Sequence, residues 1–304
     1  MKTIKIANKL TASQIALGCM RISKLSVEEL ELLIKTALDN GINFFDHADI
    51  YGSTKSESLF GEVLKRNPQL REKMYIQTKC GIRKGFYDSS KEHIISSVNE
   101  SLKRLNTNYI DVLLIHRPDT LMDLEEIALA FNTLYNEGKV LHFGVSNMNS
   151  MQMRLIEKKI NQKLIINQLQ FSVVHTGIID SGINVNMKNQ FSIDHDGSIL
   201  EYCRLNDVTI QAWSVLQASW EEGTFLNNPN YKKLNEKLEE LSIKYNVSKS
   251  AIAISFILRH PANMQAIIGT TSVDHLKELV KAYNVNLSRP EWYSLYLSGG
   301  KLLP

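Results

Sequence analysis

The chain has 304 residues, of which 43% are hydrophobic and 22% charged, a composition typical of a globular protein with a sizeable core. Its 35 basic and 32 acidic residues leave a net charge of +3 without any dense lysine and arginine run, which argues against nucleic acid as a partner. No apolar run approaches the ~18 residues of a membrane span, so no transmembrane helix is expected.

The N-terminal residues 2–17 predict a small hairpin ahead of the main fold. Thr3–Ile6 alternates like a strand, a polar turn is expected near Asn8 to Ser13, and Ile15–Cys19 forms the next strand. This last strand also serves as the first strand of the main fold. The N-terminus lacks the apolar core of a signal peptide, and we expect a cytoplasmic protein.

A helix is predicted to follow the capping box formed by Ser26 and Glu29, whose side chains can each satisfy a free backbone amide. Apolar residues then recur at helical spacing, and the helix should end near Asn40 and Gly41. From there, strand and helix alternate to the end of the chain. The predicted pairs are strand 42–45 with helix 55–66, 74–78 with 91–105, 110–115 with 123–137, 140–145 with 149–159, 164–169 with 196–205, 208–213 with 231–245 and 249–259, and 265–268 with 273–283.

Alternating strands and helices indicate a parallel sheet, and eight such units favour a closed (β/α)8 barrel over a doubly wound sheet. No GxGxxG motif follows any predicted strand, so the fingerprint of a Rossmann nucleotide site is missing. We predict a single domain over residues 1–304, with the N-terminal hairpin and an extra C-terminal helical segment. Connections 171–195 and 216–230 and the segment containing Trp292 are predicted lids on the active face.

Titratable side chains follow consecutive predicted strands at the end where barrel enzymes hold their reactive groups. Asp46 and Tyr51 follow the second strand, Lys79 the third and His116 the fourth. Taken singly, each has an ordinary explanation as a cap, a solvated charge or a core histidine. Because neighbouring strands lie only about 5 Å apart, the four side chains can converge on one point, which favours a site.

Three cysteines, Cys19, Cys80 and Cys203, are widely separated and contain no CxxC pair. This spacing argues against a disulfide framework and against a zinc knuckle, and it suits a reducing compartment. We therefore predict no metal centre.

Seven short segments, spread in order over nearly the whole chain, match the motifs of a known family. They are Asp46–Gly52, Thr78–Gly81, Tyr109–His116, Gly144–Asn147, Asn167–Gln168, Ala212–Ser214 and Ile267–Thr270, and the five-residue spacing from Asp46 to Tyr51 is kept. Through these segments the chain resembles the aldo-keto reductases, which are NADPH-dependent carbonyl reductases on a (β/α)8 barrel, and in particular a bacterial branch of that family.

The resemblance implies that Tyr51 gives a proton to the carbonyl oxygen while a hydride moves from the nicotinamide to the carbonyl carbon. A tyrosine titrates near pH ~10, so a neighbouring cation is needed to lower its pKa, and Lys79 is placed to do so. Asp46 would keep Lys79 charged and oriented. His116 would orient the substrate oxygen.

The resemblance also assigns the cofactor site, with NADP(H) as the expected cofactor and NAD(H) possible. Ser146, Asn147 and Gln168 would hold the nicotinamide carboxamide, and Trp213 would stack on its ring. The further expected contacts are Ser214, Leu216, Gly269, Thr270, Thr271, Ser272, His275 and Glu278.

The phosphate end departs from the family pattern. NADPH-selective members commonly carry a lysine and an arginine where this chain has Gly269 and His275. Free amides and hydroxyl groups at the start of the last helix suit a phosphate, but a histidine is mostly neutral at pH 7. Attraction to the 2′-phosphate is therefore expected to be weaker than in those members.

Two other functions remain open from the sequence. Lys79 could form the Schiff base of a class I aldolase, although the residues at 146–147, 168 and 213 then have no evident role. The chain could instead be an auxiliary protein that senses nicotinamide nucleotide, although such a protein would not need all four titratable groups. The expected substrate is a small aldehyde or ketone, and both a monomer and a small homo-oligomer are compatible with the sequence.

Overall fold

The computed structural model describes residues 2–304 and contains a closed barrel of eight parallel strands, which confirms the predicted fold. Met1, part of the predicted domain, lies outside the described residues. Neighbours in the barrel are also neighbours among its strands along the chain, as a (β/α)8 barrel requires. In chain order the strands are β3 (Ile15–Gly18), β4 (Phe44–Asp46), β5 (Tyr75–Cys80), β8 (Ile110–Ile115), β9 (Val140–Ser146), β10 (Leu164–Gln170), β11 (Thr209–Trp213) and β14 (Gln265–Ile268).

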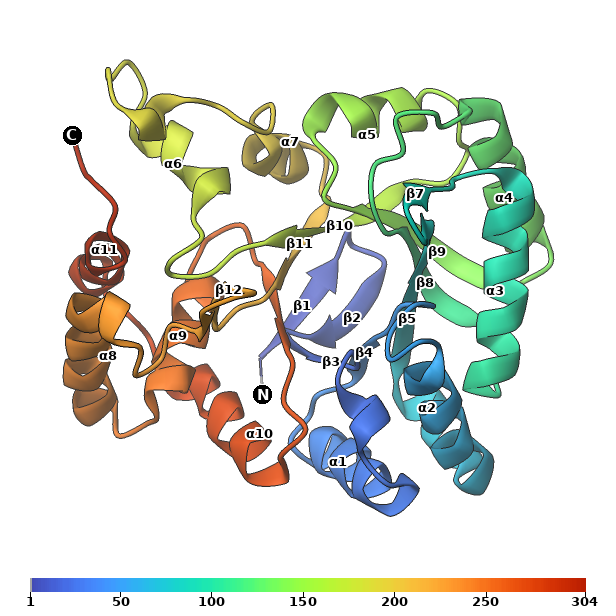
Figure 1. Ribbon diagram of the computed structural model, residues 1–304, viewed down its shortest axis with the longest axis horizontal. Coiled ribbons are helices and arrows are strands. Elements are labelled where there is room, and N and C mark those ends of the chain that lie inside the picture. Colours follow the sequence, from blue (N-terminus) through green and yellow to red (C-terminus); the bar gives the residue numbers. More distant parts are fainter. Residues whose placement is uncertain (1) are drawn as a thin grey trace.

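Helices surround the barrel on its outer face (Figure 1). The helices α2 and α3 have the predicted bounds, and α1 begins with the predicted capping box of Ser26 and Glu29. The helices are α1 (Val27–Asp39), α2 (Lys55–Arg66), α3 (Lys91–Leu105), α4 (Leu124–Asn136), α5 (Ser150–Glu157), α6 (Gly177–Ile183), α7 (Ile199–Leu205), α8 (Lys232–Tyr245), α9 (Lys249–Leu258), α10 (Val273–Val280) and α11 (Arg289–Ser298). No helix within residues 2–304 is both long and apolar enough to cross a bilayer.

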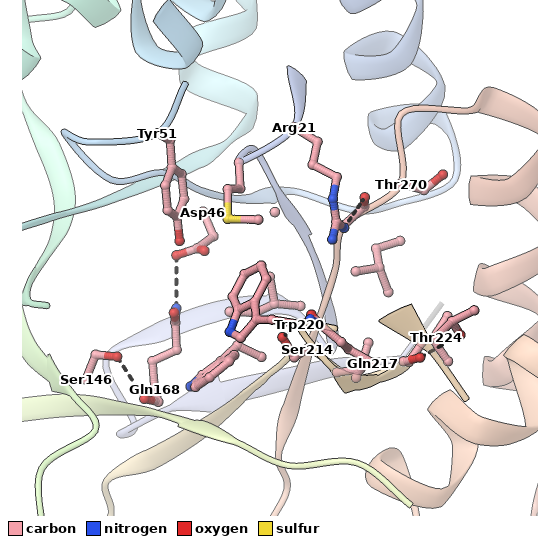
Figure 2. Close-up of a pocket in the computed structure, with 18 of the residues that line it drawn as sticks. Arg21, Asp46, Tyr51, Ser146, Gln168, Ser214, Gln217, Trp220, Thr224 and Thr270 are labelled. Atoms are coloured by element: carbon pink, nitrogen blue, oxygen red, sulfur yellow. Dashed lines mark hydrogen bonds between the residues drawn. The ribbon is translucent and has the colours of Figure 1, made fainter. Parts of the chain in front are cut away.

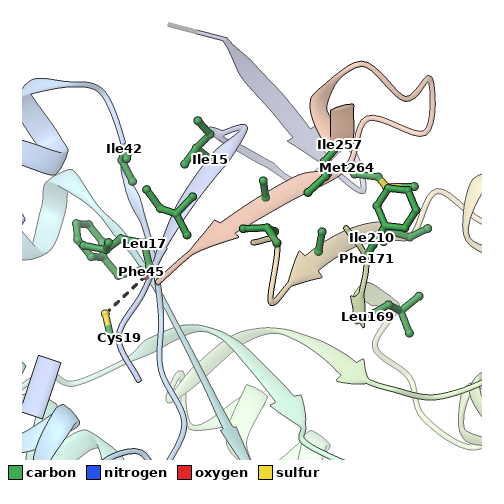
Figure 3. Packing of buried hydrophobic residues seen from close by; sticks show 14 of the residues in the cluster. Ile15, Leu17, Cys19, Ile42, Phe45, Leu169, Phe171, Ile210, Ile257 and Met264 are labelled. Atoms are coloured by element: carbon green, nitrogen blue, oxygen red, sulfur yellow. Dashed lines mark hydrogen bonds between the residues drawn. The ribbon is translucent and has the colours of Figure 1, made fainter. Parts of the chain in front are cut away.

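Side-chain alternation along the strands divides the apolar core in two. Ile15 and Leu17 of β3 belong to the large cluster between the barrel and its helices (Figure 3), whereas Ala16 belongs to a smaller cluster. This smaller cluster combines barrel residues with residues of the N-terminal hairpin. The period of two in a strand therefore places one set of side chains against the helices and the other inside the barrel.

The N-terminal hairpin differs from the prediction in its second strand. β1 (Thr3–Ile6) pairs antiparallel with β2 (Leu10–Ser13), the segment that was expected to be a polar turn. The turn is shorter, because Ala7 and Asn8 both take positive φ and the Lys9 amide donates to the Ile6 carbonyl oxygen at 2.8 Å. Leu10 is buried with the barrel-interior cluster, so burial of this apolar side chain outweighs the polar character of its neighbours.

Two of the three segments predicted as lids do not cover the pocket at the carboxyl ends of the strands, so these two predictions are wrong. Trp292 lies on α11, stacks on Phe256 of α9 with 4.5 Å between ring centroids, and donates its indole N–H to the Phe256 carbonyl oxygen. No residue from the 171–195 connection lines the strand-end pocket; instead its Asp180 accepts a 2.9 Å hydrogen bond from Tyr296 of α11. Only the 216–230 connection, with the short strands β12 (Gln217–Ser219) and β13 (Gly223–Thr224), reaches the pocket.

The contact between α2 and α3 gives a first prediction, for Gly61→Ala. A Cβ at Gly61 would lie 1.9 Å from the Arg104 carbonyl oxygen, so the two helices have to move apart. We expect this change to lower the free energy of unfolding by roughly 3 kcal/mol, measured by urea denaturation. Gly177→Ala is the control, because no atom lies within 4 Å of its Cβ position. Equal stability of the two variants would contradict the prediction.

Candidate active site

Lys79 is the centre of the polar cluster at the carboxyl end of the barrel. Its side chain is fully buried, and its ammonium donates to Asp46 Oδ1 and to the His47 carbonyl oxygen, both at 2.7 Å. A third hydrogen bond of 3.1 Å joins Lys79 Nζ to the Tyr51 hydroxyl. The register makes this meeting possible, because Asp46 of β4 pairs with Gln77 of β5. An ammonium has three hydrogens, and these three acceptors account for all of them.

The loop after β4 is held beside β5, because the Asp49 backbone N–H donates to the Lys79 carbonyl oxygen at 3.0 Å. The chain turns again after Tyr51. Gly52, Ser53 and Thr54 all have positive φ, at 58°, 54° and 75°, before α2 begins. A Cβ at Gly52 would also lie 2.5 Å from Ser23 Oγ. The close approach of the neighbouring loop therefore favours glycine at 52, where the positive φ also costs glycine nothing.

The environment of Tyr51 differs from the expectation in one respect. Burial raises the pKa of Tyr51 above its ordinary value and outweighs the lowering effect of Lys79. Lys79 lowers the pKa of Tyr51 as predicted, but desolvation disfavours the phenolate more strongly, so the net shift of this pKa is upward. Burial also disfavours the Lys79 ammonium, but the charge of Asp46 and the contact with Tyr51 raise the pKa of Lys79. At neutral pH a neutral phenol faces a charged ammonium.

His116 lies directly after β8, on the other side of Tyr51. Its ring stands edge-on to the Tyr51 ring, with 6.1 Å between centroids, and its backbone N–H donates to the Cys80 carbonyl oxygen at 2.9 Å. Burial, Lys79 and Arg117 together lower the pKa of His116 to about 2. The imidazole is therefore neutral at physiological pH and keeps one N–H to donate.

The residues expected at the nicotinamide form one connected group on the neighbouring strands β9, β10 and β11. Asn147 donates to Ser146 Oγ at 2.8 Å, and Ser146 Oγ donates to the Gln168 carbonyl oxygen at 2.9 Å. Trp213 donates its indole N–H to Asn147 Oδ1 at 3.1 Å. Gln168 Nε2 donates to Asp46 Oδ1 at 3.0 Å, as Figure 2 shows. All four residues line the same pocket as Tyr51 and His116.

The other residues expected to contact the cofactor are only partly brought together. Gly269, Thr270 and His275 line the pocket, as do Ser214 and Leu216. The other three positions, Thr271, Ser272 and Glu278, are not among the residues that line it.

Two of these three side chains have other partners. Ser272 caps α10 by accepting from the His275 backbone N–H at 3.2 Å, and Glu278 pairs with Lys281 at 2.6 Å. The Glu278 carboxylate is exposed and paired with Lys281, and the structure does not place this expected cofactor contact at the pocket wall.

The pocket has a volume of about 820 Å³ and runs from Tyr51 to the start of α10. Several of its lining residues were not predicted from the sequence, among them Met20, Arg21, Ile50, Arg117 and Trp220. Met20 and Arg21 closely follow the barrel strand β3, and Arg117 directly follows His116. These three could have been predicted by treating the residues just after every barrel strand as candidates for the site. Trp220 lies on the hairpin of β12 and β13 and has no comparable signal (Figure 2).

The fold and the pocket define an α/β-barrel protein with a polar, tyrosine-containing site at the carboxyl ends of its strands. A sequence profile of the aldo/keto reductase family matches residues 14–295, and the chain belongs to that family. The chain is thus an oxidoreductase of a family that generally binds nicotinamide cofactors.

Similar proteins span almost the full length of the chain. An uncharacterised oxidoreductase, YcsN of Bacillus subtilis, is 34% identical and covers 97% of both chains. The 6-dehydroglucose reductase of Agrobacterium fabrum is 32% identical, again with 97% of both chains covered. Among solved structures, the thermostable aldo-keto reductase Tm1743, determined with the inhibitor epalrestat, matches with a TM-score of 0.78 and 25% identity over 98% of this chain and 100% of that chain.

Proposed function

We propose that this protein is a single-domain, NADPH-dependent reductase that converts a small aldehyde or ketone to the alcohol, with Tyr51 as the general acid. The observation that carries the proposal is the 3.1 Å contact between Lys79 Nζ and the Tyr51 hydroxyl at the wall of the pocket. Because the ammonium can only donate, the phenol oxygen accepts, and the phenol hydrogen is left to point elsewhere. Within residues 2–304 that hydrogen has no protein acceptor, so a substrate oxygen in the pocket is its natural partner.

The neighbouring groups support proton transfer from Tyr51. As negative charge develops on the substrate oxygen, the Lys79 ammonium stabilises the phenolate that Tyr51 becomes. Asp46 keeps Lys79 charged, at 2.7 Å. His116, neutral and half-buried at the pocket wall, donates its N–H to the same oxygen and orients the carbonyl.

The pocket fits a nicotinamide nucleotide. When bound, the reduced nicotinamide supplies the hydride. Asn147 and Gln168 present amide groups at its expected carboxamide end, Trp213 presents an aromatic face, and the start of α10 offers backbone amides to a phosphate. Arg21, whose guanidinium lies 3.5 Å from the Gly269 carbonyl oxygen, adds a positive charge at that end.

A panel of aldehydes and ketones tests the proposal directly. Loss of NADPH absorbance at 340 nm in the presence of at least one carbonyl compound, with matching alcohol formation, is the expected result. Tight NADPH binding without turnover of any carbonyl would favour the nucleotide-sensing alternative instead.

The burial and protonation of Lys79 argue against the aldolase alternative. A Schiff base requires a neutral amine within reach of the substrate. Lys79 is fully buried, does not line the pocket, and has a raised pKa that keeps it protonated. We therefore expect borohydride to trap no carbonyl compound on Lys79, which mass spectrometry of the treated protein would check.

Cofactor choice gives a further prediction. We expect a lower dissociation constant for NADPH than for NADH by fluorescence titration, because Arg21 and the start of α10 both favour the extra phosphate. His275→Arg should tighten NADPH binding about tenfold and leave NADH binding unchanged, since it restores a permanent cation. A clearly lower dissociation constant for NADH than for NADPH in the unmodified protein would overturn this preference.

A further inference from the structure

Four buried glutamines occupy the barrel beneath Asp46. They lie on different strands: Gln77 on β5, Gln168 on β10, Gln211 on β11 and Gln265 on β14. Three of them have no exposed surface, and Gln168 is 3% exposed. Barrel interiors are ordinarily filled by branched apolar side chains, so a run of amides at this depth requires a reason.

The amides form one hydrogen-bonded chain with a fixed direction. Gln265 Nε2 donates to the Ser13 carbonyl oxygen at 2.6 Å, and Gln211 Nε2 donates to Gln265 Oε1 at 2.8 Å. Gln211 Oε1 then accepts from Gln77 Nε2 at 2.8 Å and from Gln168 Nε2 at 3.0 Å. Since a backbone carbonyl can only accept, the Ser13 end sets the orientation of every amide above it.

The chain ends at the carboxylate that pairs with Lys79. Gln77 Nε2 donates to Asp46 Oδ1 at 2.6 Å. Gln168 Nε2 donates to the same oxygen at 3.0 Å (Figure 2). Each of these amide groups therefore uses one hydrogen for Gln211 and the other for Asp46. Asp46 Oδ1 and Gln211 Oε1 are both acceptors. A flipped amide at 77 or 168 would place its own oxygen against them and lose these hydrogen bonds.

We propose that Gln77 and Gln211 are positioning residues, which hold the Asp46 carboxylate and, through it, the Lys79 ammonium against Tyr51. The inference rests on the proposed function, because it assigns these glutamines to the same proton transfer. Neither glutamine lines the pocket, so neither touches a substrate or cofactor. Gln168 does line it, and with both of its amide hydrogens engaged, its Oε1 is the atom left to accept from a carboxamide.

A buried oxygen of Gln77 without a hydrogen-bond partner indicates that this residue does more than fill space. Gln77 Oε1 is buried and has no hydrogen-bond partner in residues 2–304. A buried acceptor without a partner is costly, and an apolar side chain of similar size would avoid that cost. The unpaired Oε1 of Gln77 therefore lowers the stability of the fold, whereas its Nε2 donates hydrogen bonds to Asp46 and Gln211.

Gln77→Met removes the donor while it keeps the length of the side chain. We expect the kcat to fall about tenfold or more, with KM for the carbonyl compound and Kd for NADPH within twofold of the unmodified protein. The matched control is Gln14→Met, because Gln14 is also buried but donates only to the Leu258 and Met264 carbonyl oxygens. An equal fall in kcat for both variants would overturn the proposal and leave these glutamines a structural role.

Gln77→Glu separates positioning from packing by its pH dependence. The introduced carboxyl group can donate to Asp46 only while it is protonated, and its proximity to Asp46 in a buried site raises its pKa. The ratio of its kcat to that of the unmodified protein should therefore fall as pH rises. The same ratio for Gln77→Met should stay level. A ratio for Gln77→Glu that does not change with pH would contradict the inference.

A measurement without turnover keeps the inference separate from the proposed function. In nucleotide-free protein labelled with ¹⁵N-glutamine, Asp46→Asn should shift the side-chain amide signals of Gln77 and Gln168 and leave those of Gln14 in place. If the unmodified protein reduces no carbonyl compound but these shifts occur, the proposed function fails and the amide chain stands. Unshifted signals for Gln77 and Gln168 would reject the chain itself.

Discussion

Replacing Tyr51 by phenylalanine is expected to lower kcat for carbonyl reduction by about 10²–10⁴-fold, the usual contribution of a positioned general acid. The change removes only the hydroxyl that receives the 3.1 Å hydrogen bond from Lys79. The ring keeps its edge-on contact with His116 and its place 4.9 Å below Lys79 Nζ. We therefore expect NADPH binding to stay within a few-fold of the unmodified protein, as measured by fluorescence titration.

Tyr283→Phe is the control for this variant. Tyr283 is another enclosed tyrosine, but its hydroxyl accepts a 2.9 Å hydrogen bond from the Ile15 backbone N–H, away from the pocket. Its loss should reduce stability slightly and leave turnover intact. Near-normal kcat for Tyr51→Phe would remove Tyr51 as the acid, and a comparable loss in both variants would point to a general disturbance of the barrel.

The pH dependence of the reaction follows from the direction of the Tyr51 shift. Because burial raises the pKa of Tyr51, the phenol keeps its proton throughout the neutral range. Reduction should consequently hold its rate across neutral pH and decline only in strongly alkaline solution, where the phenol loses its proton. Stopped-flow rates of NADPH oxidation measure this.

The convergence of Asp46, Lys79 and His116 could be predicted because it depends on a rule that acts along the sequence. Each follows or ends a strand in a chain that alternates strand and helix, and parallel strands bring their carboxyl ends to one rim. The barrel itself was predictable for the same reason. In the structure the Lys79 ammonium lies 2.7 Å from Asp46, which is the contact that the rule requires.

Features that depend on three-dimensional packing were not predictable. Whether Lys79 or desolvation controls the pKa of Tyr51 depends on how deeply the phenol is enclosed, which no local pattern encodes. Leu10 lies in a strand because the barrel interior accepts its side chain, although its neighbours resemble a turn. Trp292 was expected to cover the active face, but its aromatic ring stacks on Phe256 of α9 instead.

The hydrogen-bonded chain of glutamines at 77, 168, 211 and 265 was also not predictable from the sequence. On a single strand, each glutamine resembles any isolated polar residue within or at the start of the strand. Their relation becomes visible only when the closed barrel places β5, β10, β11 and β14 around one interior space. Sequence patterns identify what ends a strand, whereas closure of the barrel decides which interior side chains meet.

Replacing Lys79 by methionine is the second large effect that we expect. The change leaves Asp46 buried without its cation, and loss of one partner of a buried ion pair lowers the free energy of unfolding by about 3–5 kcal/mol. It also removes the charge that lowers the pKa of Tyr51, so the phenol becomes a still weaker acid and kcat should fall at least about 10²-fold. Lys232→Met, at a lysine whose side chain is 81% exposed, should change neither stability nor turnover.

Combining Lys79→Met with Asp46→Asn separates the two effects. The second change removes the unpaired charge, while the amide oxygen of asparagine can still accept from Gln77 and Gln168, so much of the lost stability should return in urea denaturation. Turnover should not return, because no cation faces Tyr51 in either variant. If the double variant regained both stability and kcat, the ion pair would have only a structural role, and the general acid would have to be activated by a group other than Lys79.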